Sequence, residues 1–276
     1  ILFPFLLSKI ISNISSLQTL FASQKSKLLS ASKMLKNSYI VWEGASLIDG
    51  SPIVLILTGF VSPSLNRKTG RLIQSWILQQ EFAPTFAASR GLDQGVCGSC
   101  PLKLSQIGSC YVYLLPINNI YRKYVAGNYP KLGKNEIEVL KHYRYPIRIG
   151  SYGDPTAVPF DVWEPIISAS GGHTGYTHQF LSCDSRWKQY LMASVQSESE
   201  ARIAQSQGWR TFRIMAPDAP LSDNEILCRH TENDIIKCEF CMLCDGNSSK
   251  PNIADKVHGL KWKISNFVKY SESLSN

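Results

Sequence analysis

Residues 146–168 read PIRIGSYGDPTAVPFDVWEPIIS, and this stretch decides the fold. An apolar strand pattern over Pro146–Ser151 runs into a glycine turn, and a helical pattern over Phe160–Ser168 follows. The same rhythm continues, with strand patterns at Thr174–Phe180, Tyr190–Val195 and Trp209–Met215 and a helix at Glu198–Gln207 that Gly208 ends. Alternation at this spacing predicts βαβ units and a parallel sheet, and therefore an α/β protein.

The flanking segments predict further elements on both sides of this region. Residues 52–60 and 72–78 are apolar runs joined by a polar loop, which predicts an N-terminal hairpin. Helices are expected over residues 117–126 and 134–142, and residues 252–257 and 260–270 predict a last strand and a closing helix. Five or six parallel strands could form an open doubly wound sheet or an incomplete barrel. In both, functional residues gather at the carboxyl ends of the strands.

Polar side chains mark these expected strand ends: Ser151, Asp154, Thr177, His178, Ser194, Gln196 and Arg213. The alternative is that such residues only cap helices and turns, and Asp154 before Pro155 suits a cap. His178 is the histidine most suited to chemistry, because it ends a strand on the expected active face. The GSYGDP turn lacks the GK[ST] ending of a phosphate loop, and the chain has no GxSxG nucleophile elbow.

Seven of the eight cysteines fall into two tight groups. Cys228, Cys238, Cys241 and Cys244 form the C-terminal group, in which a CxxCxxC run has a fourth thiol just upstream. Four thiolates suit tetrahedral Zn²⁺ or a [4Fe–4S] cluster, and spacing alone does not choose between them. His230 and Asp234 are nearby substitutes for a missing ligand.

The N-terminal group is Cys97, Cys100 and Cys110, in a glycine-rich loop. Three thiolates on a [4Fe–4S] cluster leave one iron free to bind S-adenosylmethionine. A closed zinc site completed by Cys183 or a histidine is the competing interpretation. Close CxxC spacing in a long chain favours metal in a reducing, cytoplasmic compartment over secreted disulfides.

Composition indicates a globular chain of 276 residues with a net charge of +8. Residues 1–33 carry four lysines and no acid, and the first methionine is Met34. We expect residues 1–33 to be an extension outside the core, either non-native or a docked helix, and residues 34–276 to form one α/β metal-binding domain. The rest of the chain has no dense basic stripe, which makes nucleic acid a weakly supported partner. No apolar run reaches the roughly 18 residues of a membrane span.

The run RIGSYGDP, VWEPI, GYTHQF, QYLMASVQS and GWRTFRI resembles uncharacterised phage- and plasmid-borne proteins, including those with the phage "gene product eighty-eight" domain. The resemblance covers about residues 40–265 and includes the Cys110–Tyr111 pair. It implies a partial (βα)6 barrel, TIM-like and related to the radical-SAM barrel. It further implies that Cys97, Cys100 and Cys110 bind the cluster. The pocket would then be shaped by Gly150, Ser151, Gly153 and Asp154, and faced by Thr177, His178 and Ser194.

We expect the chain to be a radical-SAM-like, iron–sulfur enzyme of mobile genetic elements, with one or two [4Fe–4S] clusters, S-adenosylmethionine and an unknown substrate. Asp154 and His178 are the candidate catalytic residues, and Gly150, Ser151, Gly153, Thr177 and Ser194 are expected to contact the cofactor. The chain departs from the usual CxxxCxxC spacing, having CxxCx9C instead. The alternatives are a non-enzymatic zinc-binding accessory protein, associated with nucleic acid, and an inactive barrel held together by metal.

Overall fold

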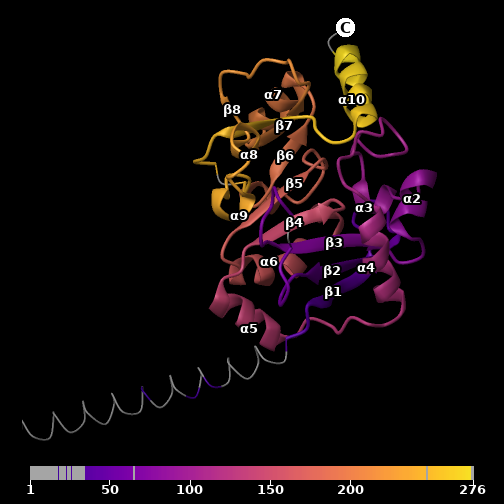
Figure 1. Cartoon of the computed structure of the whole chain (residues 1–276), viewed down its shortest axis with the longest axis vertical. Helices are drawn as coiled ribbons and strands as arrows, with labels where there is room; N and C mark the ends of the chain where they lie inside the picture. Colours follow the sequence, from indigo (N-terminus) through magenta and orange to yellow (C-terminus); the bar gives the residue numbers. More distant parts are fainter. Residues whose placement is uncertain are drawn as a thin grey trace, which may run out of the picture.

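The computed structural model describes residues 35–64, 66–246 and 248–274, together with residues 18, 23 and 26. The expected extension over residues 1–33 therefore lies almost wholly outside the described residues. Within the described part, nine strands form one sheet in the order β1-β2-β3-β4-β5-β6-β7-β9-β8 (Figure 1). The strands are β1 (Ser38–Ala45), β2 (Pro52–Thr58), β3 (Ile73–Gln79), β4 (Ile147–Tyr152), β5 (His173–Thr177), β6 (Met192–Val195), β7 (Thr211–Met215), β8 (Glu225–Leu227) and β9 (Asn252–Lys256).

The sheet is mostly parallel and is not closed into a barrel. β2 pairs antiparallel with both β1 and β3, which confirms the N-terminal hairpin and adds one strand to it. From β3 onward every pairing is parallel, and β1 and β8 stand at the two edges. The strands β3, β4, β5, β6 and β7 lie side by side in chain order, without the reversal of a doubly wound sheet.

The helices mostly follow the predicted ranges. They are α2 (Pro84–Arg90), α3 (Gln94–Cys97), α4 (Leu115–Val125), α5 (Lys134–Tyr143), α6 (Phe160–Ala169), α7 (Glu198–Ser206), α8 (Arg229–Glu232), α9 (Cys238–Cys241) and α10 (Lys261–Ser273). The pattern missed β1, β8 and the short helices α2, α3, α8 and α9. Strand β8 has three residues and α3, α8 and α9 four each, too few to show a period.

Alternating side chains give the parallel strands two different faces. Ile147 and Ile149 of β4 belong to a core that includes Trp163 and Ile166 of α6. Side chains on the other face of the sheet, such as Met192 and Phe212, pack in a separate cluster with Cys228, Leu243 and Cys244. One face of the sheet is thus covered by helices and the other by the cysteine-rich segments.

Candidate functional site

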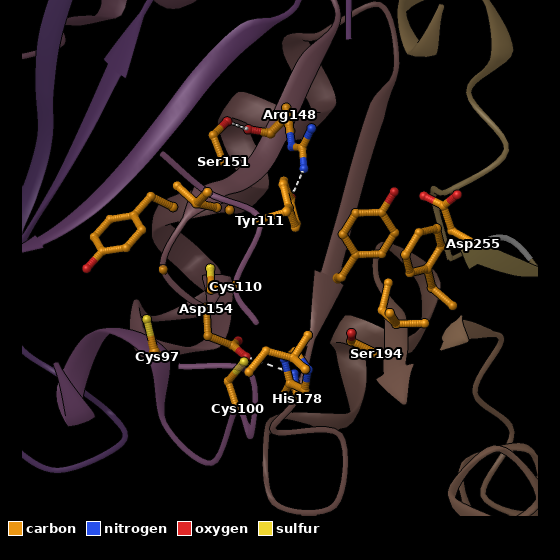
Figure 2. Close-up of a pocket in the computed structure, with 18 of the residues that line it drawn as sticks. Cys97, Cys100, Cys110, Tyr111, Arg148, Ser151, Asp154, His178, Ser194 and Asp255 are labelled. Carbon is orange, nitrogen blue, oxygen red and sulfur yellow. Dashed lines mark hydrogen bonds between the residues drawn. The ribbon is translucent and has the colours of Figure 1, made fainter. Parts of the chain in front are cut away.

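A cavity of about 150 Å³ lies between the parallel strands and the cysteine-rich segments (Figure 2). Its strand-borne lining comes from β4, β5, β6, β7 and β9: Arg148, Gly150, Ser151, Tyr152, Tyr176, Ser194, Phe212, Ile214 and Asp255. The residues Gly153, Asp154, His178 and His258 follow the ends of these strands and also line it. All three thiols of the N-terminal group complete the wall. The structure therefore brings Cys97, Cys100 and Cys110 to the strand ends that the sequence singled out.

The three thiols lie after β3, the first strand of the parallel series: Cys97 ends α3, and Cys100 and Cys110 lie in the turned loop that follows. The N–H of Cys100 donates to the carbonyl of Cys97 at 3.2 Å, and the N–H of Cys110 donates to Leu102 at 2.7 Å. Between them, the buried Lys103 ammonium donates to the Gly98 carbonyl at 2.8 Å. The same three thiols also line a second cavity of about 260 Å³.

Burial raises the pKa of each thiol in this group. For Cys97 the raised pKa also reflects Asp93, Cys100 and Cys110, and for Cys100 it reflects Cys110. Burial likewise raises the pKa of Cys110. These thiols are therefore protonated at neutral pH, and ionising them requires a bound cation, as in a metal centre.

The C-terminal group also converges. Cys228, Cys238, Cys241 and Cys244 line a small cavity of about 20 Å³ together with His230. Backbone bonds fix this segment: the N–H groups of Cys238 and Glu239 donate to Lys68 and Thr69, in the loop between β2 and β3. Burial raises the pKa of Cys244 to about 12. Asp234 does not line this cavity; it forms an exposed ion pair with Arg67.

Neither group is arranged around a single ion. Among the residues that the structure describes, no set of three or more His, Cys, Asp or Glu side chains is placed to hold a metal ion, and all eight cysteines are free thiols. Cys183, the alternative fourth ligand, does not line either cavity beside the N-terminal group.

Asp154 joins the ends of two neighbouring strands. Its buried carboxylate accepts from the N–H and hydroxyl of Thr156, from the hydroxyl of Thr177, and from the N–H of His178. The bond from the Thr156 N–H confirms the predicted cap, on the turn Pro155–Ala157. Both carboxylate oxygens are therefore occupied by protein donors, which suits positioning better than proton transfer.

His178 faces the cavity beside the cysteine loop. Its Nε2 lies 3.1 Å from Nε2 of Gln196, so the ring accepts from that amide when neutral. Burial lowers the pKa of His178 to about 4. The hydroxyl of Ser99 donates to the His178 carbonyl at 3.3 Å, which ties the Cys97–Cys100 turn to the end of β5. Arg213, by contrast, points away and forms a buried pair with Glu225 at 2.6 Å.

The cavity residues that sequence reasoning missed include Lys68, Tyr111, Arg148, Asp255 and His258. The Lys68 ammonium lies 2.5 Å from an oxygen of the buried Asp255 and 3.3 Å from His258. The guanidinium of Arg148 donates to the Tyr111 hydroxyl. Arg148 could have been found, because it alternates with Ile147 and Ile149 in an apolar strand; Lys68 carries no such signal.

Comparison with protein-family models, with curated proteins and with solved structures gave no match to this chain. The resemblance to the phage proteins and to radical-SAM barrels therefore stays a prediction. In the part of the chain that the structure describes, no helix has the length and apolar character needed to cross a membrane.

Proposed function

We propose that this chain is a radical-SAM-like enzyme, built on a partial (βα)6 barrel, with a [4Fe–4S] cluster held by Cys97, Cys100 and Cys110. The observation that carries the proposal is the position of these three thiols. They follow the first parallel strand and line the cavity at the carboxyl ends of the other strands. When bound, such a cluster supplies the electron that reductively cleaves S-adenosylmethionine.

The strand order supports a partial barrel. Six parallel strands run β3, β4, β5, β6, β7 and β9 with no reversal, and β8 only extends the far edge. A doubly wound sheet would place its ligand where the order reverses; the run from β3 to β7 has no such point, and the order turns back only at the far edge, where β9 lies between β7 and β8. The helices α6 and α7 pack on the face away from the cavity, as they would on the outside of a barrel.

The donor set suits an iron–sulfur cluster, because cysteine thiolates are the ordinary ligands of such clusters. All three thiols line the same cavity, and a cubane cluster would carry each of them on a separate iron. With three cysteines in this group, one iron of such a cluster would lack a cysteine ligand and could bind S-adenosylmethionine.

The backbone beside the thiols turns at two glycines. Gly150 and Gly153 both have positive φ, +75° and +87°, and both line the cavity with the buried Ser151 and Ser194. Thr177 is not exposed to the cavity, and its hydroxyl is held by Asp154. Asp154 and His178 would accordingly position the cofactor end of the cavity. The chain's own residues thus bind, orient and shield the reacting group from water.

The test is production of 5′-deoxyadenosine by the full chain, purified anaerobically and reduced with dithionite in the presence of S-adenosylmethionine. Cys100→Ala should abolish the product, whereas Cys183→Ala, which alters a thiol outside both cavities, should retain it. Cleavage that survives Cys100→Ala, or no cleavage by a chain loaded with four irons, would contradict the proposal.

A further inference from the structure

We infer that the Arg148 end of the main cavity is an oxyanion-binding site, which recognises a carboxylate or phosphate group of the substrate. The inference rests on the proposed function for the identity of the reacting partner, but the binding site itself stands on separate observations. Figure 2 shows Arg148 and Tyr111 at one end of the drawn pocket, with Cys100 and His178 at the other.

Arg148 is a charged side chain without a matching carboxylate. It projects from β4 to the cavity face, where its guanidinium donates to the Tyr111 hydroxyl and lies over that ring, 5.8 Å from the centroid. Its Nε is buried and has no hydrogen-bond partner. No ion pair involves Arg148 within the described part of the chain. A guanidinium left with unused donors costs free energy unless something else satisfies them.

The groups that surround Arg148 do not supply the missing charge. The acidic neighbours that influence it are Tyr111, Tyr176, Cys238 and Cys244, which are phenols and thiols. Of the two carboxylates that line the cavity, Asp255 is already bonded to Lys68 and to the Thr231 hydroxyl, each at 2.5 Å. Asp154 is the other, and both of its oxygens accept from the protein donors described above.

The Lys68 ammonium and the Asp255 carboxylate offset each other in the cavity lining, so an anion would be held by Arg148. Arginine presents a planar fork of donors that matches the oxygens of carboxylate and phosphate. A ligand with its oxyanion on Arg148 would extend across the cavity toward the thiols, which places its other end near the proposed cofactor.

The experiment titrates the full chain, purified anaerobically with its metal content measured, with inorganic phosphate and separately with sodium acetate. Binding is followed by calorimetry at constant ionic strength, with sodium chloride as the reference. The variants are Arg148→Gln, Arg148→Lys and the matched control Arg186→Gln, whose guanidinium pairs with Asp161 and Asp184 on the surface. Tighter binding of phosphate or of acetate tells which oxyanion the site prefers.

We expect one anion to bind the wild type and Arg186→Gln equally, and Arg148→Gln to weaken it roughly 10- to 100-fold. If Arg148→Gln does not fold, Arg148→Lys should still bind the anion more weakly than wild type does. Lysine keeps the positive charge but lacks the paired, planar N–H donors of the guanidinium. Equal binding by all variants, or no binding to the wild type, would overturn the inference. An altered metal content at the C-terminal group without any change in anion binding would also overturn it, since Arg148 would then serve those thiolates. Loss of 5′-deoxyadenosine production with anion binding intact would count only against the proposed function.

Discussion

The carboxylate of Asp154 accepts a hydrogen bond from the backbone N–H of His178 at 2.9 Å, across the gap between β4 and β5. This bond fixes the end of one parallel strand to the end of the next, directly beside the thiols. The cavity wall is thus held by a buried charged group whose partners are all protein donors.

Replacing Asp154 should test this role. Asp154→Ala leaves several buried donors unsatisfied and should lower the free energy of unfolding by about 3 kcal/mol or more. Asp154→Asn keeps one acceptor oxygen and should cost less. Asp161→Asn, which changes an exposed carboxylate, should have little effect in the same urea titration. An Asp154→Ala variant as stable as Asp161→Asn would contradict the bonding described for this carboxylate.

His178 should make the fold sensitive to acid. Its pKa in the folded chain is about 4, against an ordinary value near 6.5, so the unfolded state binds the extra proton between these pH values. Stability should therefore fall as the pH drops from about 6.5 to 4, by up to about 3 kcal/mol from this group.

The measurement is the free energy of unfolding of wild type and His178→Asn at pH 7 and pH 5. Other titrating groups are common to both chains, including Asp154, whose pKa burial raises. The difference between the chains isolates the imidazole. Wild type should lose more stability than His178→Asn on acidification, and an equal loss would mean that the ring is solvated.

Gly153 should resist substitution for a steric reason. It has φ of +87°, and a Cβ there would lie 2.7 Å from Cβ of Ile77 and 2.9 Å from Cγ1 of Val96. Gly127 has a similar φ of +70° with open space around it. Gly127→Ala should cost about 1–2 kcal/mol for the backbone alone, and Gly153→Ala a further 1–3 kcal/mol or so for the clash. An equal loss of stability in the two variants, measured by thermal unfolding, would show that Ile77 and Val96 move to accommodate the added methyl group.

The two cysteine groups should respond differently to loss of one thiol. Cys241→Ala should mainly lower Tm, because a metal held by the C-terminal group would contribute folding energy to the segment between β8 and β9. Cys110→Ala should abolish cleavage of S-adenosylmethionine while leaving most of the fold intact. Circular dichroism and product analysis on both variants check this. Equal loss of fold from the two changes would contradict the division between them.

Much of this architecture is visible in the sequence because the β–α alternation after Tyr145 is regular. The segments β4, α6, β6 and α7 begin within two residues of their predicted starts. Strand β1 was missed because Ser38–Ala45 mixes Tyr, Trp, Glu and Gly without clear alternation. The cysteine groups could be predicted from local spacing alone.

The contacts of the charged residues that line the cavity could not be predicted from local sequence patterns. The contact between Lys68 and Asp255 joins residues 187 positions apart, so it depends on how the hairpin loop meets the last parallel strand. Asp154 stood out as a turn residue, but its bonds to Thr177 and His178 require β5 to lie beside β4. Local pattern carries no information on either contact.

The most direct test of the central claim is the metal content of the full chain after anaerobic expression. Iron, acid-labile sulfide and zinc are measured together, and the visible spectrum is recorded before and after dithionite. We expect about four irons and four sulfides at the Cys97, Cys100 and Cys110 site, lost in Cys110→Ala, with absorbance that bleaches on reduction. Stoichiometric zinc without sulfide would contradict an iron–sulfur cluster at this site.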